Sequence, residues 1–408
     1  MGLILVLHDT PHPALYGAVA AAIAAARQCG FMHVEARFDT KLHADATQHV
    51  IASGGLGPSG LCWFERLSGK QVPPVATPES ILDAARMQDV VVPIHPAFLV
   101  DQDLPTTLSS AARALGIEVK AIIIREDSDC FFDAATREIL ALRDRFGRIG
   151  LHAPPFHESD GLTIGLIGAE SDHRDVYPAA LASLADAADS LSIPIDVRFI
   201  DPVHINQIED PAVFDGLSGI LLPGGADMKN VAGQTAAAAL SLEIGLPTIG
   251  LCLGMQTMAT AVAWRAFGRS TANLAEADPD APIKTFVPMA GVRDPDGNVL
   301  PIHRTGDQRI DIVPCTQLSG IVGSERQIRC NHRFRLNPAL LSDLEVAGLR
   351  IAASSSAGAI VDAIEVPGHS FFIGMQGHPE LSSRADMPYS LIVAFLESAA
   401  KRRPSSTS

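Results

Sequence analysis

At the centre of this chain lies the stretch Pro247-Thr-Ile-Gly-Leu-Cys-Leu-Gly-Met-Gln256. The apolar residues 246–251 predict a buried strand, and the residues after Met255 predict a helix. Cys252 falls between two glycines at the turn from strand to helix, which is the thiol version of a nucleophile elbow. The glycines allow a tight backbone, and a helix N-terminus favours a thiolate. The stretch therefore predicts an α/β fold that carries a cysteine nucleophile at the end of a strand.

A second motif, Gly374-Met-Gln-Gly-His-Pro-Glu380, supplies the groups that such a nucleophile needs. The apolar residues 371–375 predict another strand, and His378 follows it with Glu380 two residues later. A lone cysteine is more often a buried, unreactive side chain. Together with Cys252, however, the motif provides a nucleophile, a base and an orienting carboxylate in the order Cys, His, Glu.

Composition narrows the class of protein. The 408 residues suffice for two or three domains, and 31 Lys and Arg against 46 Asp and Glu give a net charge of −15. This balance argues against nucleic acid and anionic membranes as partners. The six cysteines lack paired spacing, so we expect neither disulfides nor a metal site. The N-terminus leads directly into an apolar strand and no apolar stretch is long enough to span a membrane, so we expect a cytoplasmic protein.

The alternation of short β-rich runs with alanine-rich helical runs predicts parallel sheets flanked by helices. Four parts are expected. Residues 1–127 would form an N-terminal Rossmann-like α/β domain without a visible active site, and 128–161 a helix and linker. Residues 162–400 would form a flavodoxin-like domain with the elbow, and 401–408 a disordered tail. The helix is expected over 132–146, and a strand of the first domain over 33–38. The order of elements in 3–38 repeats in 163–199, which fits either a duplication or the ordinary pattern of such folds.

Several separated stretches of the second domain resemble the class I glutamine amidotransferases, and among them the glutaminase domain of CTP synthase. Besides the two motifs above, they are Asp175-Val-Tyr177, Ile220-Leu-Leu-Pro-Gly-Gly225, Arg304-Thr-Gly306, Asn331-His-Arg-Phe-Arg-Leu-Asn337, Ala347-Gly-Leu-Arg350 and Ile364-Glu-Val-Pro367. The resemblance covers about residues 162–400 and implies a flavodoxin-like amidotransferase domain that needs no cofactor.

The resemblance also implies a catalytic mechanism. Cys252 would attack the γ-amide carbon of glutamine and form a γ-glutamyl thioester, His378 would transfer protons, and Glu380 would orient the imidazole. The backbone N–H groups of Gly225 and Leu253 would form the oxyanion hole.

For substrate binding, the resemblance implies a second set of residues. Arg333 would bind the carboxylate of glutamine, while Glu276 and Gln256 would bind its ammonium and amide groups; Gly224 and Phe334 complete the set. Two simpler interpretations remain open. Arg333 lies in a crowd of arginines that could pair on the surface, and Glu276 lies in an acidic run that could be a solvated loop. His332 matches a histidine of the family, but no chemistry is assigned to it.

Two departures from the family pattern leave the acceptor of the ammonia, and the substrate itself, undetermined. Residues 1–150 lack the P-loop signature of the ATP-binding synthetase domain, so we do not expect a complete CTP synthase. Gly377 replaces the usual phenylalanine before the histidine, which could enlarge the pocket. Three functions therefore compete: a glutaminase that passes ammonia to a separate synthetase subunit, a hydrolase of other γ-glutamyl amides, and a non-catalytic glutamine or γ-glutamyl sensor. A homo-oligomer is expected in each case.

Overall fold

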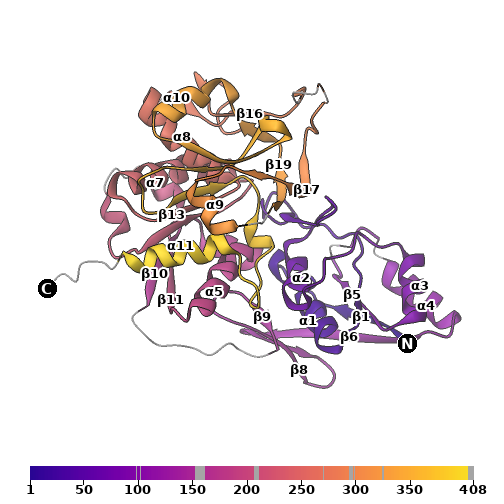
Figure 1. The fold of residues 1–408 in the computed structure, drawn as a ribbon. Coiled ribbons are helices and arrows are strands. Elements are labelled where there is room, and N and C mark those ends of the chain that lie inside the picture. Colours follow the sequence, from indigo (N-terminus) through magenta and orange to yellow (C-terminus); the bar gives the residue numbers. More distant parts are fainter. Residues whose placement is uncertain are drawn as a thin grey trace. The chain divides into compact units, whose positions relative to one another are not determined.

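The computed structural model describes residues 1–97, 99–101, 103–151, 161–205, 211–269, 271–293, 297, 299–323 and 326–402 (Figure 1). The chain divides into two compact units. Unit 1 consists of Met1–His157 and Ser171–Ala182, and unit 2 of Glu158–Glu170 and Ser183–Ser408. The expected linker over 152–160 and residues 403–408 of the expected tail lie outside the described residues.

Unit 1 is built on a seven-stranded sheet with the order β2-β5-β1-β6-β7-β8-β9. Its strands are β1 (Gly2–Leu7), β2 (Gly30–Phe31), β5 (Val90–Ile94), β6 (Glu118–Asp127), β7 (Cys130–Asp133), β8 (Ile139–Arg143) and β9 (Ile149–Gly150). The first four strands of this order are parallel, and the last three extend the sheet in antiparallel fashion. Its longest helices are α1 (Ala18–Arg27), α3 (Pro78–Met87) and α4 (Leu104–Ala114). Helices between parallel strands produce the predicted α/β class.

Two sequence predictions for this unit are wrong. The helix expected over 132–146 is replaced by β7 and β8, because β6 continues beyond its parallel neighbour and its free edge is paired by Phe131 and Phe132. Both phenylalanines are buried, and aromatic side chains favour the pleated surface of a sheet. The strand expected over 33–38 is reduced to a single bridge between Ala36 and Leu99.

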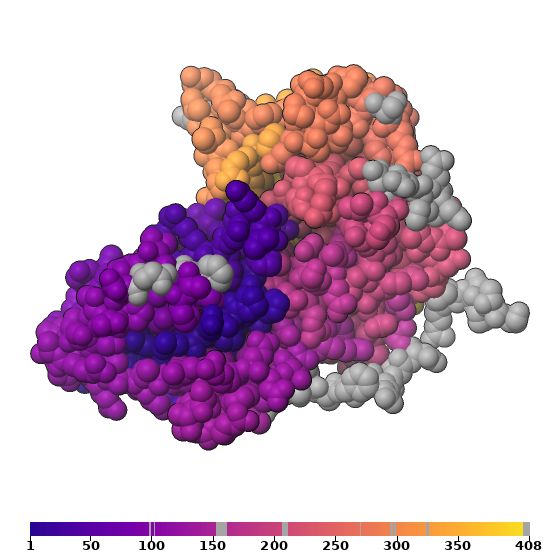
Figure 2. All heavy atoms as spheres, turned by 180° about the vertical axis from the view of Figure 1, so that it is seen from behind, coloured from indigo at the N-terminus to yellow at the C-terminus, as the bar shows by residue number. Residues whose placement is uncertain are grey.

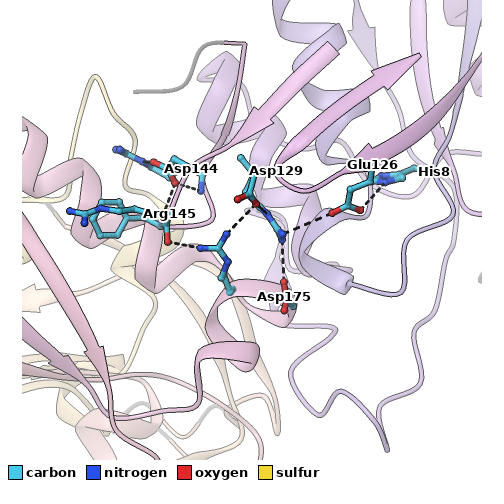
Figure 3. A network of polar contacts seen from close by, with 10 residues as sticks. His8, Glu126, Asp129, Asp144, Arg145 and Asp175 are labelled. Atoms are coloured by element: carbon cyan, nitrogen blue, oxygen red, sulfur yellow. Dashed lines mark hydrogen bonds and ion pairs between the residues drawn. The ribbon is translucent and has the colours of Figure 1, made fainter. Parts of the chain in front are cut away.

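Ser171–Ala182 belongs to unit 1 through a network of arginines and carboxylates (Figure 3). Arg143 contacts Asp129 at 2.8 Å and Asp175 at 3.1 Å. Arg174 donates to Asp129 at 3.2 Å. Because Arg143 and Arg174 share a carboxylate, the network ties a short π-helical turn over Asp172–Val176 to the β7–β8 ribbon.

Unit 2 is built on an eight-stranded sheet with the order β11-β10-β12-β13-β23-β22-β21-β18. Its strands are β10 (Leu162–Leu166), β11 (Ile195–Phe199), β12 (Gly219–Leu222), β13 (Thr248–Leu251), β18 (Asp311–Ile312), β21 (Arg350–Ser355), β22 (Ile360–Glu365) and β23 (Phe372–Met375). The strands from β11 to β23 are parallel, and the remaining three are antiparallel. The helices that bear on the site are α7 (Val231–Ile244), α8 (Leu253–Phe267) and α11 (Ser390–Lys401), and α5 (Ala179–Leu191) begins in unit 1.

The strand orders of the two sheets differ, and this bears on the suspected repeat. β1 lies between β5 and β6, the third and fourth parallel strands of its unit. β10 lies instead between β11 and β12, the second and third strands of its unit. The two halves therefore do not share one topology, which favours the ordinary pattern of α/β folds over a duplication.

The predicted β-rich region after α8 consists of short two-stranded ribbons. They pair β14 (Ala272–Asn273) with β15 (Ile283–Lys284), β16 (Phe286–Pro288) with β20 (Phe334–Leu336), and β17 (Arg304–Arg309) with β19 (Gln327–His332). The orange residues of this region lie together at the top of unit 2 in Figures 1 and 2. Among the described residues, no helix is long and apolar enough to cross a membrane.

Candidate functional site

Cys252 lies at the turn between β13 and α8 with a backbone φ of 50° and ψ of −104°. Such a conformation is rare for a residue with a side chain and is typical of a strained elbow. Its neighbours must be glycines: a Cβ on Gly254 would lie 2.0 Å from the carbonyl oxygen of Leu222, and one on Gly250 would lie 2.3 Å from Sδ of Met258. Gly254 therefore allows α8 to approach β12, and Gly250 allows it to approach β13, so that the cysteine lies at the N-terminus of the helix.

His378 and Glu380 follow β23, the direct parallel neighbour of β13. Both side chains are fully buried, and Nδ1 of His378 lies 2.7 Å from Oε1 of Glu380. The backbone N–H of His378 donates to the carbonyl of Arg329 at 2.7 Å, which holds this turn against β19. The imidazole and the side chain of Cys252 both border Gly224, and Cys252 is close enough to raise the pKa of the ring. The structure thus brings the three predicted residues together.

The electrostatic surroundings favour a charged imidazole. Burial lowers the pKa of His378, but the adjacent Cys252 and Glu380 raise it more, so its pKa lies well above the ordinary value of 6.5. A buried imidazolium is stable only beside anions. The geometry therefore suits an imidazolium that can donate a proton to a leaving group.

The predicted oxyanion-hole residues lie at the same edge of the sheet. β12 is the other neighbour of β13, and the glycine pair at positions 224 and 225 follows it directly. A Cβ on Gly224 would lie 3.0 Å from Cε1 of His378 and 3.4 Å from Cβ of Cys252. Leu253 is the first residue of α8, where a backbone N–H has no acceptor within the helix. Gly224 and Leu253 therefore border the cysteine, and Gly225 is the residue next to Gly224.

The other residues predicted to bind glutamine lie farther from Cys252. Gln256 is buried one turn along α8 from Cys252. Arg333 and Glu276 are exposed and close enough to interact: partial desolvation raises the pKa of Glu276, and the charge of Arg333 opposes this. Phe334 is half-buried beside them at the start of β20. The cation and the carboxylate are thus neighbours, as recognition of a zwitterionic amino acid requires.

Two polar groups beside the thiol were not predicted. The side-chain amide of Gln376 donates to Sγ of Cys252 at 3.8 Å, and the thiol donates to the backbone carbonyl of Asn331, also at 3.8 Å. The amide of Gln256 in turn lies 3.5 Å from Oε1 of Gln376. Gln376 precedes His378 by two residues, and alternate residues of an extended segment share a face, so this spacing could have identified it. No local signal pointed to Asn331.

The expected enlargement of the pocket at Gly377 is wrong. A Cβ at this position would lie 2.4 Å from Cγ1 of Ile328 and 2.7 Å from the carbonyl oxygen of Arg329. The volume left by the absent side chain is therefore filled by β19, whose backbone approaches the turn directly. Gly377 allows this approach and does not widen a substrate pocket.

Cys330, His332 and Asp362 form a buried cluster whose ligand atoms lie within 4.8 Å of one another, a spacing that a metal ion could use. The cluster already holds a cation, because Arg304 pairs with Asp362 and its Nη1 lies 3.5 Å from Nε2 of His332. A metal would have to displace the guanidinium. We therefore interpret the cluster as a buried ion pair with a neutral histidine.

Comparison with known families agrees with this geometry. The model of the family "Glutamine amidotransferase class-I" matches residues 173–397, more than half of the chain. The chain belongs to the class I glutamine amidotransferase family. The domain with the elbow is therefore an amidotransferase domain, as the sequence motifs predicted.

Individual relatives narrow the similarity to CTP synthase. The chain is 31% identical to CTP synthase of Thermus thermophilus over 249 residues, which cover 60% of this chain and 45% of that protein. It is 30% identical to CTP synthase of Chloroflexus aurantiacus over 303 residues, or 70% of this chain and 55% of that protein. The chain therefore spans about half the length of the curated relatives it matches.

A solved structure gives the same result for the fold. The glutaminase domain of Trypanosoma brucei CTP synthase with bound acivicin superposes with a TM-score of 0.54 at 27% identity, covering 59% of this chain and 95% of that domain. The amidotransferase domain thus resembles the glutaminase part of CTP synthase.

Proposed function

We propose that this chain hydrolyses the γ-amide of L-glutamine through a γ-glutamyl thioester on Cys252. The observation that carries the proposal is the buried arrangement of Cys252, His378 and Glu380 at the ends of neighbouring parallel strands. A nucleophile, a base and an orienting carboxylate gathered at adjoining strand ends are the parts of a thiol acyl-transfer site.

The chemical steps follow from this geometry. The thiolate of Cys252 attacks the amide carbon, and the oxygen gains charge that the N–H groups of Gly225 and Leu253 stabilise. The His378 imidazolium then gives its proton to the nitrogen, the carbon–nitrogen bond breaks, and ammonia leaves. A water molecule next attacks the thioester while His378 accepts its proton. Glutamate is released, and the thiolate and imidazolium are restored.

Substrate recognition is assigned to the outer residues. Arg333 pairs with the α-carboxylate of glutamine, and Glu276 pairs with the α-ammonium. Gln256 lies closer to Cys252 and contacts the amide end, with Gly224 and Phe334 bordering the substrate. The exposed positions of Arg333 and Glu276 support an entrance to the site on this side of unit 2.

Ammonia is proposed to pass to an acceptor on a synthetase partner, by analogy with the relatives named CTP synthase. The γ-glutamyl amide hydrolase gains no support from Gly377, since β19 fills the space beside it. The presence of the nucleophile, the base and the orienting carboxylate argues against a non-catalytic sensor.

Release of glutamate by the purified chain tests the proposal. Wild type is expected to release glutamate from glutamine, and Cys252→Ala is expected to abolish the release. A panel of larger γ-glutamyl amides separates the alternatives, because faster turnover of those amides than of glutamine would select the hydrolase. Activity that survives Cys252→Ala would exclude the thioester. If glutamine is bound but no substrate is turned over with any partner fraction added, the sensor becomes the better description.

A further inference from the structure

A buried ion pair lies behind the candidate active site. Arg304 on β17 pairs with Asp362 on β22, and their side chains are only 4% and 0% exposed. β22 belongs to the eight-stranded sheet, whereas β17 belongs to the separate ribbon with β19. Within unit 2, the pair therefore fastens the ribbon to the main sheet.

The guanidinium also faces His332, the register partner of Arg304 on β19. Nδ1 of His332 lies 2.9 Å from the carbonyl oxygen of Phe334, and Nε2 lies 3.5 Å from Nη1 of Arg304. The ring must donate from Nδ1 and present its Nε2 lone pair to the cation. Burial, together with Arg304, lowers the pKa of His332 to about 3, so the ring stays neutral. His332 thereby fixes the backbone on both sides of Arg333.

The strand held in this way crosses the reacting groups. The carbonyl of Asn331 accepts from the thiol of Cys252 at 3.8 Å, and the carbonyl of Arg329 accepts from the N–H of His378 at 2.7 Å. The next residue after β19 is Arg333, the proposed ligand of the substrate carboxylate. A shift of β19 would therefore move the substrate cation and the wall over the thiol together.

We propose that the Arg304–Asp362 pair is a positioning device that holds β19 and Arg333 over Cys252, so that glutamine is bound with its amide at the thiol. The inference rests on the proposed function. Neither residue touches the reacting atoms, and both act through the strand. A buried charged pair suits this purpose because sliding of the ribbon would separate the two charges. Each charge would then be buried without a counterion, at a large cost in free energy.

The test compares Arg304→Met, Arg304→Lys and the double variant Arg304→Met/Asp362→Leu with a matched control, Arg309→Met, which removes an exposed arginine from the same strand. Three quantities are measured: the KM and kcat for glutamine, the rate of Cys252 alkylation by uncharged iodoacetamide, and the thermal unfolding midpoint. The double variant leaves no unpaired charge, so it is expected to fold even where Arg304→Met does not.

We expect Arg304→Met and the double variant to raise KM by about tenfold or more while kcat falls by less than about threefold, because binding geometry is lost and the reacting groups are retained. Alkylation of Cys252 should become faster, since β19 no longer covers the thiol. Arg304→Lys should recover part of the KM, and Arg309→Met should match wild type. A folded double variant with the KM and alkylation rate of wild type would overturn the proposal.

The two proposals fail in different ways. If wild type does not turn over glutamine, the proposed function fails, but the alkylation rates still report whether the ion pair holds β19 over the thiol. If glutamine is turned over and the double variant keeps both the KM and the alkylation rate of wild type, only the positioning role fails.

Discussion

Nδ1 of His378 lies 2.7 Å from Oε1 of Glu380, and both groups are completely buried. With Nδ1 engaged by the carboxylate, Nε2 is the ring nitrogen that can exchange a proton with Cys252 or its substrate. The two residues are separated by a single proline in the chain, so a short helical turn, Pro379–Leu381, suffices to form the contact. The proposed orienting group is thus part of the same turn as the proposed base.

The first prediction concerns Glu380→Gln. Both Glu380 and Cys252 raise the pKa of His378 against the effect of burial. Loss of the carboxylate charge lowers this pKa, so the imidazolium loses its proton at a lower pH. Because the imidazolium is the proposed acid for the departing ammonia, activity is expected below its pKa and should be lost as pH rises through it. We expect kcat to fall by about 10²-fold or more, with the alkaline limb of the profile shifted to lower pH.

A pH–rate profile of glutaminase activity measures both effects. Asp386→Asn is the matched control, because this carboxylate is 75% exposed and pairs with Arg384 instead. An unchanged alkaline limb in Glu380→Gln would show that Glu380 does not control the protonation of His378.

The second prediction concerns Gly377→Ala. The added methyl group would overlap Ile328 and approach the carbonyl of Arg329 to 2.7 Å, so β19 must retreat from the turn. We expect a lower unfolding midpoint and weaker glutaminase activity, with a loss of about 1–3 kcal/mol in the free energy of unfolding. Thermal unfolding and steady-state kinetics measure the two effects.

A double variant distinguishes the overlap with the Ile328 side chain from the overlap with the Arg329 carbonyl. Ile328→Ala combined with Gly377→Ala should recover only part of the loss, because the backbone carbonyl of Arg329 still blocks the methyl group. Full activity in Gly377→Ala alone would mean that β19 does not fill this space.

The third prediction concerns Gln376→Met. This change keeps the size of the side chain but removes the amide that donates to Sγ of Cys252 at 3.8 Å. A hydrogen bond to sulfur stabilises the thiolate, so alkylation of Cys252 by iodoacetamide at pH 7 should slow by about threefold to tenfold. Gln308→Met is the control, since that side chain donates to the carbonyl of Thr305 within its own strand. An alkylation rate equal to that of wild type would rule out a role for Gln376 in activating the thiol.

The parts of the fold that could be predicted are those encoded by local patterns. β12 and β13 are short apolar runs that end in glycines, and the elbow and the histidine motif follow such runs. Strand β8, over 139–143, was not predicted because charged residues interrupt its apolar positions at a helix-like spacing. This segment forms a strand only because β7 pairs with the free edge of β6 and β8 pairs with β7. Tertiary context overrides local preference in such segments.

In the candidate site, too, only residues in local motifs could be predicted from the sequence. The proposed nucleophile and the proposed base each lie in a motif whose residues are close in the chain. Asn331 and Arg304, in contrast, reach the site through strand pairing and through an ion pair that spans 58 residues. The role of Gly377 depended on Ile328, a residue on a different strand. Contacts between remote strands leave no periodic signal in the sequence.

The last prediction concerns acid stability of unit 1. His8 follows β1, packs edge-on against Phe131, and lies 3.9 Å from the carboxylate of Glu126. Burial, together with the nearby His95, lowers its pKa from 6.5 to about 4. The unfolded chain therefore binds a proton between these two values that the folded chain does not, and stability falls as pH drops from 6.5 to 4. Between pH 7 and pH 5 this histidine alone should cost about 2 kcal/mol.

Urea unfolding at the two pH values measures this difference. The chain has two tryptophans, so a Trp264→Phe background leaves Trp63 as the fluorescent reporter of unit 1. His8→Leu should unfold with a smaller difference between pH 7 and pH 5, because the titrating group is gone. His43→Leu is the control, since that histidine also lies in unit 1 but is only partly buried. Equal pH sensitivity in His8→Leu and wild type would mean that His8 is protonated as readily in the folded chain as in the unfolded one.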